Sequence, residues 1–68
     1  MRDILEIAIA DEIEARDYYR HAADVAADMH TRQVLLDLSA MEQGHADTLR
    51  KELEEIDLQR DLEAGMAD

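Results

Sequence analysis

The absence of proline constrains this chain more than any other feature. The only two glycines are Gly44 and Gly65, so neither proline nor glycine interrupts a helix in the first 43 residues. The composition is mostly Ala, Leu, Glu, Asp and Arg. The sequence therefore predicts an all-α protein.

Residues at alternating steps of three and four predict two amphipathic helices. The first helix is expected over about residues 3–27 and the second over about residues 31–64, where Gly65 can end it. The inward positions of the first helix are Leu5, Ala8, Glu12, Ala15, Tyr19, Ala22 and Ala26. Those of the second are Leu35, Leu38, Glu42, His45, Leu49, Glu52 and Ile56.

The turn between the helices is expected at about residues 28–31. Asp28 and Thr31 are both good residue types for capping the start of a helix. No linker or change of composition suggests a second unit, so residues 1–68 are expected to form one antiparallel helical hairpin.

A lone hairpin of this size is expected to be only marginally stable. It has 68 residues, with only fifteen Ile, Leu and Val and no Phe or Trp. Domains of this size usually need a disulfide, a metal or oligomerisation, and the absence of Cys removes the first. Self-association, a metal with oxygen and nitrogen ligands, or both are therefore expected.

The net charge of the chain limits the classes of molecule that it can bind. A net charge of −11 repels nucleic acid and anionic membrane surfaces and attracts cations. The sequence shows neither a long apolar run nor a secretion signal, so a cytoplasmic protein without nucleic-acid or membrane partners is expected.

Three residues with metal-binding side chains occupy inward positions where a structural helix pair would carry apolar residues: Glu12, Glu42 and His45. Glu42 and His45 are three residues apart and so point the same way on a helix. Glu12 lies 16 residues before Asp28 and Glu42 lies 14 after it, which places them roughly 24 and 21 Å from the bend. A metal would remove the cost of burying these acids. Iron or manganese suits such ligands, and zinc is also possible.

One chain supplies half of a known ligand set. A di-iron carboxylate bundle takes two single Glu and two E-x-x-H pairs from four helices. Two copies of this hairpin would provide that set. We therefore predict a homodimer that forms a four-helix bundle, with Glu42 of each chain bridging two ions while Glu12 and His45 hold one ion each.

Two segments carry a resemblance to a known family. Residues 10–19, Ala-Asp-Glu-Ile-Glu-Ala-Arg-Asp-Tyr-Tyr, and Glu-Gln-Gly-His at 42–45 resemble the ferritin-like superfamily, its rubrerythrin branch, and most closely the encapsulated ferritins. The resemblance implies a ferroxidase with two iron ions per dimer that oxidises Fe(II) to Fe(III) for iron storage. It carries over to Glu12, Glu42 and His45 as ligands, to Tyr19 as the aromatic near the metal, and to Asp11 and Glu14 as acids that guide incoming ions.

The resemblance also implies further partners. They are a larger ring of dimers and an encapsulin shell, although the sequence stops at Asp68 without an obvious shell-docking peptide. The absence of Cys excludes the rubredoxin-type iron centre of full rubrerythrins. Gly44 inside the E-x-x-H pair weakens the helix by roughly 1 kcal/mol relative to Ala.

Other interpretations stay open. The same ligands could serve a di-metal peroxide scavenger, or the chain could be a metal-free helical interaction module. In the latter case Glu12 would be a surface acid paired with Arg16, four residues on. His21 and His30 are expected at the surface, and so is Glu52, because Leu53 can take its inward position.

Overall fold

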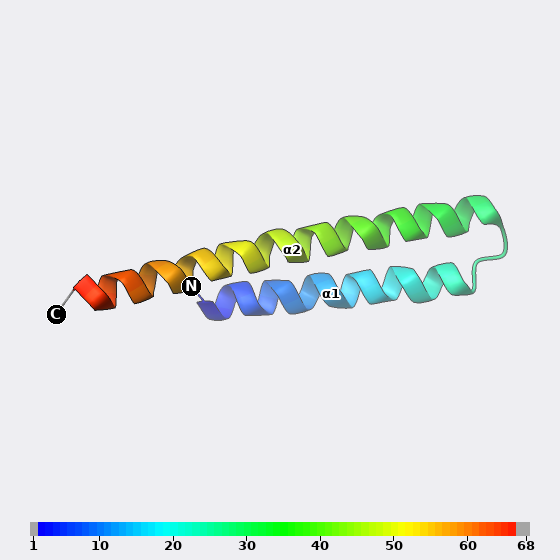
Figure 1. Cartoon of the computed structure of the whole chain (residues 1–68). Coiled ribbons are helices and arrows are strands. Elements are labelled where there is room, and N and C mark those ends of the chain that lie inside the picture. The colour runs from blue at the N-terminus through cyan, green and yellow to red at the C-terminus, as the bar shows by residue number, and fades with distance from the viewer. Residues whose placement is uncertain (1, 67–68) are drawn as a thin grey trace.

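The protein is a pair of antiparallel α-helices (Figure 1). The computed structural model describes residues 2–66, in which α1 spans Arg2–Asp24 and α2 spans Met29–Met66. No strand occurs among these residues. The pair forms a thin rod with extents of 61 × 15 × 12 Å, and α2 continues well past the start of α1 (Figure 1). The prediction of an all-α helical hairpin is thus confirmed.

The first helix ends earlier than predicted. It stops at Asp24 instead of near residue 27. The amides of Val25 and Ala26 bond the carbonyls three residues back, on Ala22 and Ala23, both at 3.3 Å. Such tight bonds are typical of the last turn of a helix and leave the chain ready to reverse.

The second helix starts earlier than predicted, because Asp28 caps it. Asp28 Oδ1 accepts a hydrogen bond from the Thr31 amide at 2.8 Å, and its Oδ2 accepts one from Thr31 Oγ1 at 2.9 Å. These bonds hold the pKa of Asp28 below its ordinary value of 3.8. Thr31 is therefore the third helical residue and not the cap. At the other end α2 runs through Gly65, which does not act as the predicted stop.

The interface between the helices is narrow and contains small side chains. Ala23 and Ala46 are almost completely buried, and so is the hydroxyl-bearing Ser39. All the predicted inward positions of the first helix are half-buried, although Ala26 lies after the end of α1. On α2 the inward positions differ from the prediction after Glu42, because Ala46 and Leu53 face α1 while Glu52 is exposed. The prediction that Leu53 can replace Glu52 is confirmed.

Large apolar side chains remain at the surface of this thin rod. Those on α1 are Ile4, Ile7 and Tyr18, and Val25 follows directly after α1; each is more than half exposed. On α2 the exposed set comprises Met29, Val34, Leu36, Met41, Leu58 and Leu62. Within residues 2–66, neither helix combines the length and apolar character that crossing a bilayer requires.

Candidate metal centre

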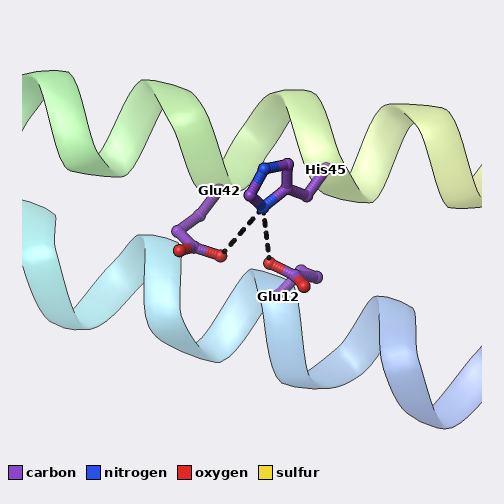
Figure 2. A group of neighbouring side chains, drawn as sticks. All are labelled: Glu12, Glu42 and His45. Atoms are coloured by element: carbon purple, nitrogen blue, oxygen red, sulfur yellow. Dashed lines mark hydrogen bonds and ion pairs between the residues drawn. The ribbon is translucent and has the colours of Figure 1, made fainter.

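Glu12, Glu42 and His45 lie together between the two helices (Figure 2). Each offers one ligand atom, and the three atoms lie within 4.8 Å of one another. Glu12 comes from α1, whereas Glu42 and His45 are three residues apart on one side of α2. The structure therefore brings together the three residues that the sequence placed at one level.

His45 approaches both carboxylates through one ring nitrogen. Its Nδ1 lies 3.4 Å from Glu12 Oε2 and 3.6 Å from Glu42 Oε2 (Figure 2). The side chain of Glu42 is 15% exposed and that of Glu12 28%, whereas that of His45 is 54% exposed. His45 is thus at the edge of the interface and not inside it as predicted, since Ala46 takes the inward position.

The carboxyl group of Glu12 perturbs the pKa of Glu42. The pKa of Glu42 is raised above its ordinary value of 4.5, first by a hydrogen bond with the Glu12 carboxyl, then by burial and by the charge of Glu12. His45 acts in the opposite direction. One histidine therefore does not offset two acids, and a cation at this point would favour the ionised form of both.

Arg16 does not neutralise Glu12. Its guanidinium pairs with Asp17 and donates a hydrogen bond to the Gln43 side chain. No ion pair joins Arg16 to Glu12 within the part of the chain that the structure describes. The alternative interpretation of Glu12 as a surface acid paired with Arg16 is thus wrong.

Asp11, Glu14 and Tyr19 do not join the three clustered residues. Together with Tyr18 they line a hollow along α1. The two tyrosine rings meet edge to face, with centroids 5.7 Å apart. Tyr19 is half-buried and follows Glu12 by seven residues, or roughly 10 Å along the helix. His21 and His30 are exposed and lie outside the cluster.

Comparison with known proteins decides the family. A family model for rubrerythrin matches residues 3–67, which is nearly the whole chain. The chain belongs to the rubrerythrin family. Proteins of the rubrerythrin family generally bind iron. No curated protein and no solved structure gives a significant match.

The clustered side chains fit the metal that rubrerythrin-family proteins bind. Two carboxylates and an imidazole are suitable ligands for iron. Three residues are half of the set that a di-iron carboxylate bundle uses, in which each of the four helices contributes. One rubrerythrin-type hairpin therefore carries three residues of the types that such a bundle uses as ligands.

Several residues around this rubrerythrin-type site were missed by the sequence analysis. Ser39, Gln43 and Ala46 all lie within four residues of Glu42 and face α1 at least in part. A signal was present, because positions 35, 39, 42, 46, 49, 53 and 56 follow alternating steps of four and three. Ser39 and Ala46 are too small and too weakly apolar to mark that pattern in a search for apolar residues.

Proposed function

We propose that this rubrerythrin-family chain is a ferroxidase that oxidises Fe(II) to Fe(III) at a di-iron site shared between two copies, in the service of iron storage. The observation that supports this most is the group formed by Glu12, Glu42 and His45, whose ligand atoms lie within 4.8 Å of one another. They are brought together from two helices at one level of the rod. The family supports iron as the metal.

The surface of the hairpin supports the participation of a second copy. Ile4, Ile7 and Tyr18 recur at steps that keep them on one exposed face of α1. On α2, Val34 and Met41 are seven residues apart and His45 follows four later, so an exposed apolar face includes the histidine. A second hairpin that covers these faces would also bring its own two glutamates and histidine to the site.

The ligands have distinct roles in the proposed dimer. Glu42, the least exposed of the three, would bridge the two ions, while Glu12 and His45 would each hold one. Two bound Fe(II) ions supply the two electrons that convert O₂ and two protons to H₂O₂, leaving two Fe(III). Because the pKa of Glu42 is raised without metal, binding of the cation should release protons from the site.

Iron oxidation by variants tests this proposal. Glu42→Ala and His45→Ala should each abolish most of the Fe(III) formed in air, measured by absorbance together with oxygen uptake. His30→Ala is the matched control, because His30 is an exposed histidine on the same helix. Equal losses in all three variants, with helix content unchanged, would contradict the proposal.

Two further measurements separate the alternative functions. Faster turnover of Fe(II) with peroxide than with oxygen would indicate a peroxide scavenger. Elemental analysis of protein purified without chelator should find about one iron per chain, since a di-iron dimer holds that ratio. Protein free of Fe, Mn and Zn, and unable to take up Fe(II), would indicate a helical interaction module.

We further propose that the dimer acts in the cytoplasm and that the Fe(III) collects in a larger assembly, either a ring of dimers or an encapsulin shell. A rod of 61 × 15 × 12 Å is too thin to enclose mineral. Light scattering tests the first step, because Fe(II) should shift a monomer and dimer mixture towards dimer or larger species. A mass distribution that stays constant from no iron to several equivalents would count against a shared site.

A further inference from the structure

Arg16 connects α1 to α2 on both sides of Glu42. Its Nη1 donates a hydrogen bond to Gln43 Oε1 at 2.6 Å, and its backbone carbonyl accepts one from Ser39 Oγ at 2.9 Å. Ser39 precedes Glu42 by three residues and Gln43 follows it directly. One residue of α1 therefore holds the turn of α2 that carries Glu42 from both directions.

The guanidinium of Arg16 is itself held in place. Its Nε and Nη2 bind Asp17 Oδ1 at 2.9 and 2.8 Å, and its side chain is only 21% exposed. Gln43 is fixed in turn, because its Nε2 donates to Asp47 Oδ1 at 2.9 Å. The result is a continuous row of polar side chains that crosses from α1 to α2 beside the candidate site.

This arrangement keeps the Arg16 guanidinium from pairing with the carboxylates of Glu12 and Glu42. Arg16 follows Glu12 by four residues, a spacing at which Glu and Arg commonly pair. Within residues 2–66, however, the structure gives Arg16 no ion pair with either Glu12 or Glu42. An arginine bound to these carboxylates would compete with a metal ion for the same oxygens.

The turn of α2 that carries the site needs such support. Gly44 lies between Gln43 and His45, and a glycine weakens a helix because its backbone has more freedom to lose. A Cβ at this position would meet nothing within 4 Å, so Gly44 does not pack against α1. The hydrogen bond between Arg16 and Gln43 acts on the adjacent residue.

We propose that Arg16 is a positioning residue of the metal centre. Through Ser39 and Gln43 it holds Glu42 and His45 opposite Glu12, and its pairing with Asp17 leaves the two acids free for the cation. The metal-binding part of this inference rests on the proposed function, whereas the holding of the α2 turn does not.

Amide hydrogen exchange of the metal-free protein tests the holding of the turn. In Arg16→Ala and in Gln43→Ala, exchange at residues 42–46 should be about fivefold faster than in the parent, the change that one lost hydrogen bond produces. Arg20→Ala is the matched control, since Arg20 is an exposed arginine four residues further along α1. Parental exchange in both test variants, or equal acceleration in the control, would overturn the proposal. Gln43→Ala keeps the test valid if Arg16→Ala does not fold.

Metal titration tests the consequence for the site. Loss of a residue that orients metal ligands typically lowers affinity about 10- to 100-fold. Arg16→Ala and Gln43→Ala should therefore bind Fe(II) more weakly by that factor, with a changed visible spectrum of bound Co(II) and a smaller effect on the oxidation rate at saturating iron. Arg16→Lys should recover part of the affinity. Affinity and spectrum equal to those of the parent in both alanine variants would refute the role of Arg16 at the metal centre. A parent that binds no iron would refute the proposed function, and amide hydrogen exchange would then decide whether Arg16 holds the turn of α2.

Discussion

Replacing Ala46 by Leu tests how closely the two helices pack beside the candidate site. Ala46 has an exposed fraction of 0% and directly follows His45. Leucine adds three carbon atoms at a position that solvent does not reach. Because both helices are continuous through this level, the added side chain can fit only if α1 and α2 move apart or the neighbouring side chains shift.

The size of the effect follows from this burial. Inserting carbon atoms into a filled interface typically costs about 1–3 kcal/mol. For a domain of this length, 1 kcal/mol lowers the melting temperature by about 4–8 °C. Ala46→Leu should therefore lower the melting temperature of the metal-free protein by roughly 4–24 °C. It should also weaken Fe(II) binding, because His45 and Glu42 move away from Glu12.

Circular dichroism melts in chelator measure this shift. Ala40→Leu is the control, because Ala40 is exposed on the same helix and the two residue types have similar helix propensities. All proteins must be compared at one concentration, since association makes the melting temperature depend on it. If Ala46→Leu melts no lower than Ala40→Leu, the packing at this level is looser than the structure indicates.

Three further predictions concern single side chains. Ser39→Ala should destabilise the metal-free protein by about 1 kcal/mol, because it removes the hydrogen bond that a buried hydroxyl makes between the helices. Thr48→Ala, which removes an exposed hydrogen bond within α2, should not destabilise it. Equal urea midpoints for the two variants would contradict this. Asp28→Asn should make the melting temperature depend less on pH at acid pH. The lowered pKa of Asp28 gives the parent stability that is present above pH 3.8 and lost as the pH falls through the lowered value. A variant whose melting temperature changes in parallel with that of the parent throughout acid pH would show that the charge of the cap contributes nothing. Glu42→Gln should make the melting temperature of the metal-free protein less sensitive to rising pH. The raised pKa of Glu42 beside Glu12 gives the parent stability that is fully present below pH 4.5 and lost as the pH rises through the raised value. Melting temperatures that change in parallel for parent and variant from acid to neutral pH would refute the reasoning.

The family resemblance was visible in short segments of the sequence. The match of the rubrerythrin model to residues 3–67 confirms the rubrerythrin branch. The closeness to encapsulated ferritins, the ferroxidase activity and the dimer stay proposals. They depend on contacts with a second chain or on reactions with iron, and the periodicity of one chain specifies neither.

The ends of the helices show where local signals are insufficient. Asp28 and Thr31 were both suitable caps, and their types alone gave no reason to prefer one. In the structure Thr31 donates two hydrogen bonds to Asp28, which makes Asp28 the cap and starts α2 at Met29. The choice depends on the course of the whole turn and not on either residue alone.

The sequence by itself determined that the chain is a helical hairpin and that Glu12 lies level with Glu42 and His45. Both follow from regular helix geometry, in which each residue adds a fixed rise and rotation. Only the tertiary structure decided that Ala46 faces α1 while His45 lies at the edge of the interface. Neighbouring residues differ by about 100° around a helix, so packing against the partner helix selects between adjacent positions. In the same way Arg16 could pair with any acid in reach of its long side chain, and its contact with Gln43 arises only when α2 lies beside α1.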